Sequence, residues 1–348
     1  MIWQLVDSSG IGGIESHITN LTLALNAAGH PTKITLLKRH TTNPWFEQLN
    51  QKKLDWVCLA DGFSNLRKTL KTERPALLHT HGYKAGILGR IAAKSLKIPV
   101  VSTFHAGERG KFPVSLYQTI DEWTSCLGAR IAVNDIIAKQ MPFKTQSIRN
   151  FILPFLPSPL AGEGDPKDRV RGIIKPISVG FVGRLSHEKA PDLFCKIAEQ
   201  TNKSIPFHIF GDGIMRAVLE AKYSSRVTFH GVATNMESVW PKIGLLCMPS
   251  RAEGLPMAAL EALNHGIPVL ASKAGSFRSI ITQNETGWVN SIDDLSSMVL
   301  AVENWAASSA QARIKLSQNC IIDVQKRFGA NEPLAQILTI YEKERLNL

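Results

Sequence analysis

Glu253 and Glu261 stand where two carboxylates could hold the two ends of one polar ligand. They occur in the segment from Pro249 to Leu263, in which an apolar strand is expected to lead into a helix. They are eight positions apart, which is at most about 12 Å along a helix, so each could accept hydrogen bonds from hydroxyls on either side of a diphosphate. Taken alone, the pair is equally consistent with a purely structural role, in which Glu261 is a charge near the amino end of the helix and Glu253 a loop carboxylate.

The start of the same helix is an expected anion site. Pro256 suits a first helical turn, because the N–H group that proline lacks would have no partner there. The neighbouring N–H groups, around Gly254 and Leu255, have no acceptor inside the helix and point toward the loop. The segment therefore predicts phosphate binding next to Glu253.

A second segment, residues 180–192, carries cations after another expected strand. Ligands bind beyond the carboxyl ends of parallel strands, where Arg184 could clamp a diphosphate with its fork of donors and Lys189 could act as a mobile point charge. A solvated basic loop is the alternative interpretation. The position of this segment opposite the Glu253 loop, in the same half of the chain, favours the binding role.

The first half of the chain offers a glycine turn and two histidines at strand ends. Gly12 and Gly13 precede Glu15 and allow a phosphate or sugar to approach the backbone closely, although the turn lacks the full dinucleotide fingerprint. His81 and His105 each follow a short apolar strand, at the edge where open parallel sheets bind ligands. One such histidine is more often structural, but two that face one crevice favour a binding role.

Short apolar strands alternate with amphipathic helices over most of the chain. The expected strands are residues 2–6, 33–37, 56–59, 77–79 and 100–104, then 177–182, 207–210, 227–230, 244–248 and 269–271. Helices are expected after them, among them 84–96 and those that begin at Pro191, Gly213 and Pro256. This alternation is typical of parallel sheets covered on both faces, and two such series predict two doubly wound α/β domains.

Composition sets the expected domain boundaries. Proline and glycine crowd residues 154–172, which can sustain neither a helix nor a central strand. We therefore expect a first domain over residues 1–160, a linker over 161–172 and a second domain over 173–330. A C-terminal helix over 331–348 is expected to pack back towards the first domain.

Overall composition excludes a disordered or fibrous chain, because 44% of the 348 residues are hydrophobic and 20% are charged. The 40 Lys and Arg exceed the 29 Asp and Glu, and the net charge of +11 favours an anionic partner: nucleic acid, a phosphorylated substrate or an acidic membrane. Five scattered cysteines argue against a disulfide framework or a zinc site. With neither a leader-like start nor a long apolar run, a cytoplasmic protein is expected, one that can lie on the inner face of a membrane.

Together the motifs resemble the retaining glycosyltransferases of family 4, whose GT-B fold consists of two Rossmann-like doubly wound domains facing a central cleft. The resemblance rests on a Gly-Gly-x-Glu loop at 12–15, histidine strand ends at 79–81 and 103–105, the phosphate-binding loop at 183–189, and a Glu-x7-Glu signature formed by Glu253 and Glu261. Two departures concern local loop shape: Phe151 follows Asn150, and Ala190 follows Lys189, where the family often has glycine.

The resemblance implies a role for each candidate residue. The first domain would bind the acceptor and the second the nucleotide sugar, with Glu253 on hydroxyls of the donor sugar and Glu261 on those of the ribose. The implied catalytic residues are Glu253, His105, Arg184 and Lys189; the implied donor-binding residues are Gly12, Gly13, Arg184, Lys189, Glu253, Gly254, Leu255, Pro256 and Glu261; Glu15 and His81 lie on the acceptor side. No metal and no other cofactor is expected, because the chain has no Asp-x-Asp pair.

The implied activity is hexosyl transfer, with retention of configuration, from a nucleotide-diphosphate sugar to a hydroxyl of a glycan or lipid-linked glycan, as in polysaccharide or lipopolysaccharide synthesis. Contact with an anionic membrane is expected and contact with nucleic acid is not. One alternative is a GT-B enzyme of the epimerase type, which releases sugar without an acceptor. The other is a basic nucleic-acid-binding protein, which the dispersed basic residues and the 7% of aromatic residues disfavour.

Overall fold

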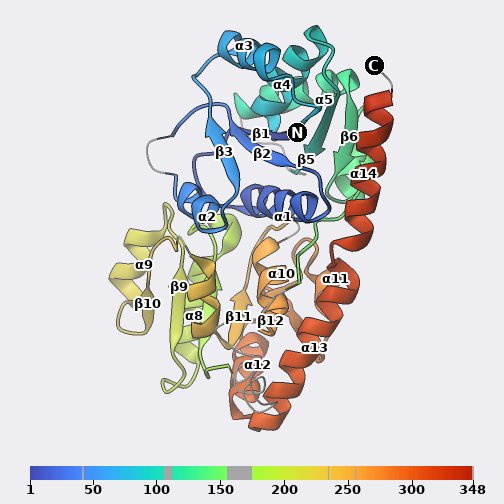
Figure 1. Ribbon diagram of the computed structural model, residues 1–348. Helices are drawn as coiled ribbons and strands as arrows, with labels where there is room; N and C mark the ends of the chain where they lie inside the picture. Colours follow the sequence, from blue (N-terminus) through green and yellow to red (C-terminus); the bar gives the residue numbers. More distant parts are fainter. Residues whose placement is uncertain (41–42, 106–111, 155–174, 234, 255, 347–348) are drawn as a thin grey trace. The chain divides into compact units, whose positions relative to one another are not determined.

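The computed structural model describes residues 1–40, 43–105, 112–154, 175–233, 235–254 and 256–346. Contacts divide the chain into two compact units, one formed by residues 1–153 with 329–348 and the other by residues 154–328. Residues 161–172, the expected linker, lie outside the described residues. Each unit contains one parallel sheet with helices packed on it (Figure 1).

The first unit has seven strands in the order β3-β2-β1-β4-β5-β6-β7, and each neighbouring pair is parallel. Its elements are β1 (Ile2–Val6), α1 (Gly13–Ala27), β2 (Thr32–Leu36), α2 (Trp45–Gln51), β3 (Asp55–Cys58), α3 (Phe63–Glu73), β4 (Leu77–His81), α4 (Tyr83–Ser95), β5 (Val100–Phe104), α5 (Val114–Thr124), a 3₁₀ turn (Ser125–Leu127), β6 (Ala129–Ala132), α6 (Asp135–Gln140), β7 (Gln146–Ser147) and α14 (Asn331–Leu346). All five residues of β1, β4 and β5 are buried, as expected for central strands covered on both faces.

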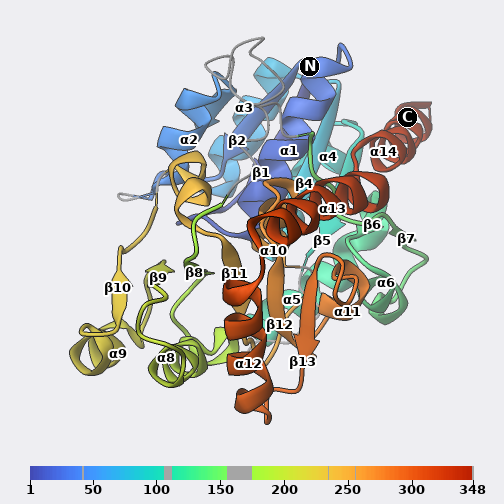
Figure 2. The ribbon, with the colours of Figure 1, turned by 90° about the horizontal axis from the view of Figure 1, so that it is seen from below.

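The second unit has six strands in the order β10-β9-β8-β11-β12-β13, also all parallel, and Figure 2 shows them in this order. Its elements are β8 (Val179–Val182), a 3₁₀ turn (His187–Lys189), α8 (Pro191–Gln200), β9 (Phe207–Phe210), α9 (Arg216–Tyr223), β10 (Val227–Phe229), two 3₁₀ turns (Met236–Ser238 and Trp240–Lys242), β11 (Leu245–Met248), α10 (Met257–Asn264), β12 (Val269–Ser272), α11 (Phe277–Ile280), β13 (Gly287–Asn290), α12 (Leu295–Ala307) and α13 (Ala310–Phe328). Side chains of α8, α9 and α12 join those of the sheet in one apolar core.

Helix α14 is the last element of the chain, yet it packs in the first unit. It contacts β5 and α1 (Figure 1), and its residues Ile337, Ile340 and Tyr341 share an apolar core with Leu25 and Phe151. A β-bridge pairs Ile152 with Gly329, just before this helix. The two points at which the chain passes from one unit to the other, after residues 153 and 328, therefore lie side by side.

The expected parallel α/β architecture is confirmed, and every expected strand is present with ends shifted by two residues or fewer. The expected start of one helix is wrong, because α9 begins at Arg216 and not at Gly213. Residues 213–215 are held in a loop instead: the N–H of Gly213 donates to the side chain of the preceding Asp212, and that of Met215 donates to the carbonyl of Leu185 in the loop after β8.

Candidate functional site

The candidate residues of the second unit lie where its strand order reverses. The order departs from β8 in both directions, to β9 on one side and to β11 on the other. At such a point the loops after the two central strands turn away from each other, which leaves room for a ligand beyond the carboxyl ends of the strands. Arg184 and Lys189 follow β8, while Glu253 and Gly254 follow β11.

Lys189 and Glu253 form an ion pair at this point. The Nζ atom of Lys189 is 2.5 Å from Oε1 and 2.7 Å from Oε2 of Glu253, and the hydroxyl of Ser250 donates to Oε2 at 3.3 Å. The Glu253 side chain is 6% exposed and that of Lys189 is 27% exposed. Two of the three ammonium donors are thus directed at one buried carboxylate, and the third remains for another acceptor.

The two loops are fastened together next to this pair. The guanidinium of Arg251 donates to both carboxylate oxygens of Asp192, at 2.8 and 2.6 Å, and to the carbonyl of His187. The backbone N–H groups of Arg251 and Ala252 both donate to the carbonyl of Glu188. Arg251 also holds the pKa of the Asp192 carboxyl below its usual range. A bidentate, charge-assisted pair gives the loops one defined arrangement.

Arg184 is held far less tightly than Lys189. Its side chain is 75% exposed and its Nη1 lies 3.9 Å from Oε1 of Glu188. The hydroxyl of Ser186 donates to the same oxygen at 2.5 Å. Partial burial raises the pKa of Glu188, but the Ser186 hydrogen bond and the nearby cations outweigh it and lower the pKa overall. The guanidinium can therefore reorient toward an anion at small cost.

Ala190 explains one departure from the family pattern. It adopts φ 54° and ψ 49°, in the left-handed region, and caps the amino end of α8. Glycine is the usual residue at such a position because a Cβ atom costs about 1–2 kcal/mol there. The loop therefore has the backbone shape that glycine would favour, although alanine occupies the position.

Helix α10 carries the second glutamate of the signature. Pro256 precedes the helix as its cap, with φ −75° and ψ 102°, and the helix begins at Met257. Glu261 is therefore its fifth residue and is partly buried. Helix geometry leaves the first N–H groups of α10 without acceptors inside the helix, next to the exposed Gly254. Leu255, an expected donor-binding residue, lies outside the described residues.

Gly275 brings the next loop against the backbone of Glu253. A Cβ atom on Gly275 would lie 1.8 Å from the carbonyl oxygen of Glu253, and the residue has φ +52°. Replacing Gly275 with alanine is expected to destabilise the protein by about 3 kcal/mol, because strained backbone and overpacking add. Denaturant unfolding measures this change.

Gly254→Ala is the matched control for that substitution, since a Cβ atom on Gly254 meets nothing within 4 Å. Its free energy of unfolding should stay within about 0.5 kcal/mol of the wild-type value. Equal stabilities for the two alanine variants would show that Gly275 does not fix the Glu253 loop.

The first unit also reverses its strand order at its candidate residues, between β1 and β4. Gly12 caps α1 and Gly13 is its first residue, and both are exposed. Glu15 lies in the first turn, with one carboxylate oxygen 3.2 Å from the point that a Cβ atom on Gly12 would occupy. The carboxylate thus folds back over the glycine turn, as expected for an acidic group at a helix amino end.

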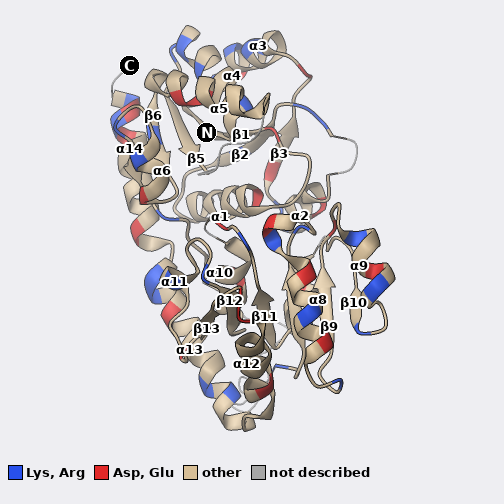
Figure 3. Ribbon diagram, turned by 180° about the vertical axis from the view of Figure 1, so that it is seen from behind, with Lys and Arg blue, Asp and Glu red and all other residues tan. Residues whose placement is uncertain are grey.

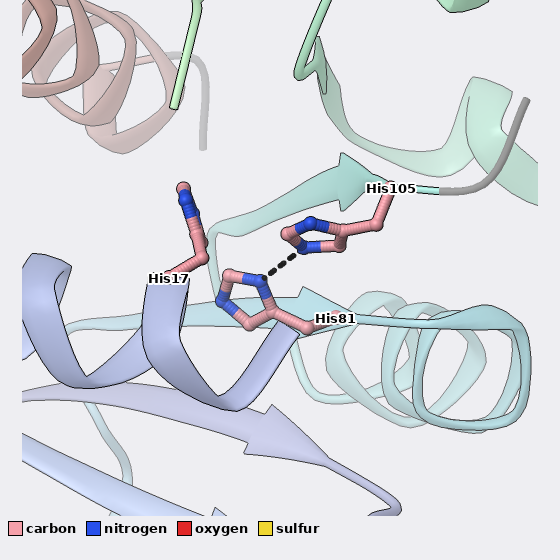
Figure 4. A group of neighbouring side chains, drawn as sticks. All are labelled: His17, His81 and His105. Carbon is pink, nitrogen blue, oxygen red and sulfur yellow. Dashed lines mark hydrogen bonds between the residues drawn. The ribbon is translucent and has the colours of Figure 1, made fainter. Parts of the chain in front are cut away.

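Four histidines gather beside this turn. His81 Nδ1 lies 3.1 Å from His105 Nε2 (Figure 4). His81 Nε2 lies 2.6 Å from Oε1 of Gln4. His79 is part of the core: its ring nitrogens lie 2.6 Å from the Tyr341 hydroxyl and 2.7 Å from that of Thr103. Burial is the main cause that holds the pKa of His79, His81 and His105 well below the usual value.

His17, on α1, is the fourth histidine and was not a candidate from the sequence. Its ring centroid is 4.9 Å from that of His105, and burial lowers its pKa to about 4. Its only sequence signal is its position, four residues after Gly13 and so one helical turn behind the glycine loop. Such a signal does not distinguish a site residue from a core histidine.

Asp7 is a second residue that the sequence did not single out. It directly follows β1, and its carboxylate lies 2.9 Å from Nζ of Lys84 and 3.0 Å from Nε2 of His40. Burial raises the pKa of Asp7, but the hydrogen bonds from His40 and Lys84 lower it overall. The pair with Lys84 links the loop after β1 to the start of α4.

Two family profiles match the chain. Residues 11–140 match the profile described as Glycosyltransferase Family 4, and residues 176–308 match that described as Glycosyl transferases group 1. An α-1,3-galactosyltransferase of Escherichia coli, which acts from UDP-Gal on α-D-GlcNAc-diphosphoundecaprenol, is 26% identical over 80% of this chain and 78% of its own length. The lipopolysaccharide core mannosyltransferase LpsB of Rhizobium meliloti is 30% identical over 47% of this chain and 51% of its own length.

Solved structures agree with these matches. HepE of Anabaena, in complex with UDP, aligns with a TM-score of 0.75 at 16% identity over 98% of this chain and 99% of its own. Staphylococcus aureus TarM, solved with UDP, aligns with a TM-score of 0.77 at 11% identity over 98% of this chain and 99% of its own. Likeness at such low identity establishes the fold alone.

Two parallel α/β domains with candidate residues at their topological switch points, together with these matches, define a glycosyltransferase with the GT-B fold. The chain belongs to glycosyltransferase family 4.

Proposed function

We propose that the protein transfers a hexosyl group from a UDP-sugar to a hydroxyl of a lipid-linked glycan, with retention of configuration and without a divalent cation. The observation that carries this proposal is the ion pair of Lys189 and Glu253 at the switch point of the second unit. UDP as the nucleotide is supported by the UDP in HepE and the UDP-Gal of the Escherichia coli relative. A diphosphoundecaprenol-linked acceptor is supported by the same relative.

The proposed roles follow from charge. The departing UDP gains negative charge as the glycosidic bond breaks, and Lys189, Arg184 and the amino end of α10 would stabilise it. Glu253 would bind hydroxyls of the donor sugar and Glu261 those of the ribose. The remaining assignments concern the first unit: Gly12 and Gly13 near the donor phosphates, His105 near the donor sugar, Glu15 and His81 on the acceptor side.

Retention is proposed to follow front-side attack, in which the donor phosphate helps to take the acceptor proton. Glycosidases retain configuration through a carboxylate nucleophile that forms a covalent intermediate. Mass spectrometry of the enzyme after a rapid quench distinguishes the two routes. A glycosyl group attached to any carboxylate of the chain would refute front-side attack.

The direct test of the function is an assay of purified protein with a panel of UDP-sugars and an undecaprenyl-diphosphate-linked acceptor, in EDTA. Transfer to the lipid, with UDP released in equal amount, is the expected result. Release of free or epimerised sugar without an acceptor would instead support the epimerase alternative. A requirement for added magnesium would refute transfer without a metal.

Nucleic-acid binding remains the less favoured class. Lys and Arg are distributed over helices of both units and do not gather on one element among the described residues (Figure 3). A salt-sensitive gel shift, combined with no binding of any UDP-sugar, would favour that class over transfer.

Membrane contact is proposed to occur through helix α5, which buries a charged residue and exposes its large apolar residues, the opposite of an ordinary surface helix. Its buried residue Asp121 is paired with the fully buried Arg90 at 2.6 Å. Its large apolar residues face outward instead: Leu116, Tyr117, Ile120 and Trp123 are 50%, 48%, 38% and 62% exposed. We call these four residues the α5 face. Exposed apolar patches of this kind mark sites of interaction with a protein or a membrane.

The surroundings of the α5 face favour a membrane. Trp123 contacts Phe143, and the guanidinium of Arg130 lies over the Phe143 ring at 5.7 Å. Tyr117 stacks on Tyr83. Tryptophan and tyrosine are enriched where a bilayer meets water, and a neighbouring cation suits anionic headgroups. Among the described residues, no helix is both long and apolar enough to cross a bilayer.

A triple variant tests the α5 face: Leu116→Gln, Ile120→Gln and Trp123→Gln. Binding to vesicles that contain anionic lipid is expected to weaken at least 100-fold, because inserting each apolar side chain contributes about 1.5–3 kcal/mol. Cosedimentation at low and high salt measures binding, and wild-type binding should also weaken with salt. Ile322→Gln, an exposed position on α13, is the matched control. Unchanged binding by the triple variant would contradict the proposal.

A further inference from the structure

Three imidazoles from three separate elements converge in the first unit. His17 comes from α1, His81 from the end of β4 and His105 from the residue after β5. One ring nitrogen from each lies within 4.8 Å of the other two (Figure 4). The parallel pairing of β4 with β5 places the two strand ends side by side, and α1 covers them.

The hydrogen bonds of His81 direct one of its lone pairs into the cluster. The side-chain oxygen of Gln4 can only accept, so the proton of His81 lies on Nε2, and its Nδ1 accepts the hydrogen bond from Nε2–H of His105. A bound ion would take the place of that His105 proton. Histidines that bind metals are oriented in this way by a carbonyl on their other nitrogen. Nε2 of His17 is buried and forms no direct hydrogen bond of good geometry, although the side chain of Asn150 lies close enough to interact with the ring.

Three imidazole ligands favour one class of metal ion. Neutral imidazoles suit zinc, copper, nickel and cobalt, whereas calcium and magnesium require oxygen ligands. Ligands of a tetrahedral zinc with bonds of 2.0–2.1 Å lie about 3.3 Å apart. The 3.1 Å between His81 Nδ1 and His105 Nε2 is close to this spacing, and the nitrogen of His17, within 4.8 Å of both, would have to move toward them on binding.

We propose that His17, His81 and His105 bind one divalent transition-metal ion, with zinc the ion of best-matched chemistry. Three protein ligands leave a fourth position for water. The sequence pointed away from a zinc site, because its five cysteines are scattered along the chain. The ion would connect α1 to the ends of β4 and β5.

The ion would also compete with the proposed donor contact of His105. This consequence rests on the proposed function: an imidazole nitrogen bound to a metal cannot accept a hydrogen bond from a sugar hydroxyl. Zinc is therefore expected to inhibit transfer, and not to support it.

Cobalt titration of chelator-treated full-length protein tests the site directly. We expect one Co²⁺ per chain, with the intense visible absorption of a four- or five-coordinate ion and without the band of a thiolate ligand. His17→Gln should abolish this absorption, whereas His208→Gln, at a histidine pair of the second unit, should preserve it. Absorption no stronger than that of Co²⁺ in buffer, or retained in His17→Gln, would overturn the proposal.

Zinc provides a second readout that does not depend on catalysis. At a concentration 100 times its Kd, zinc should raise the midpoint of thermal unfolding by about 5 °C in wild-type protein and not in His17→Gln. The ratio of transfer rates with and without zinc should fall in wild-type protein and stay near one in His17→Gln. A zinc-bound wild-type protein with undiminished activity would refute the role of His105 but not the metal site. No stabilisation of wild-type protein would refute the site.

Discussion

Lys189→Met is expected to lower kcat/KM for sugar transfer by about 100- to 1,000-fold. The ammonium of Lys189 is fixed by Glu253 at 2.5 and 2.7 Å before any ligand binds, so it needs no reorganisation to meet the charge that develops on the departing diphosphate. Loss of one such preorganised donor typically costs this much. Methionine retains the apolar stem and removes only the charge. Initial rates at varied donor concentration measure the effect.

A double-mutant cycle of Lys189→Met and Glu253→Gln measures the energetic coupling between the two residues. Each single variant should be strongly impaired, because each leaves the other group without its partner. The fold loss of kcat/KM in the double variant should be far smaller than the product of the losses in the two single variants, since residues in contact act as a unit. Lys196→Met, at an exposed lysine on α8, is the control for loss of a charge. Multiplicative effects, or near wild-type rates in both single variants, would remove the pair from the site.

Acidification to pH 4 in a chelating buffer is expected to destabilise the protein by at least about 3 kcal/mol. An unfolded histidine has a pKa near 6.5, whereas burial lowers that of His17 to about 4. Between these values the unfolded state binds more protons, so the free energy of unfolding falls as the pH falls. The stability is fully present above about pH 6.5. The lowered pKa values of His79, His81 and His105 act in the same direction.

Denaturant unfolding at a series of pH values measures this loss. Between pH 7 and pH 4, the free energy of unfolding of His17→Gln should fall by about 3 kcal/mol less than that of the wild type. The reason is that the variant lacks the histidine whose lowered pKa accounts for that amount. His30→Gln, at an exposed histidine, should leave the curve parallel to that of the wild type. Equal unfolding free energies at pH 7 and pH 4 would contradict the neutral, buried state of the cluster.

Local patterns predicted the sheets because a parallel strand covered on both faces is a nearly continuous apolar run. Ile2–Val6 and Val100–Phe104 are found with the expected bounds for this reason. The positions of Arg184 and Glu253 at one edge of the sheet could be predicted as well, because the carboxyl ends of parallel strands all lie on the same edge.

Contacts between distant residues could not be predicted in the same way. Lys189 and Glu253 were expected to bind different parts of a ligand, and the structure pairs them with each other across 64 positions of sequence. His17 was missed because a histidine on the buried side of a helix has the pattern of a core residue. The start of α9 was misplaced because hydrogen bonds to a neighbouring loop, and not helix propensity, determine residues 213–215.

The return of α14 to the first unit affects how the chain is made. Synthesis proceeds from the amino end, so the core residues of the first unit that pack against Ile337, Ile340 and Tyr341 are translated long before helix α14 itself. The second unit is complete first, and the amino-terminal half must wait for the last helix to leave the ribosome. A nonsense codon shortly before residue 331 would therefore damage the half of the molecule that was translated earliest.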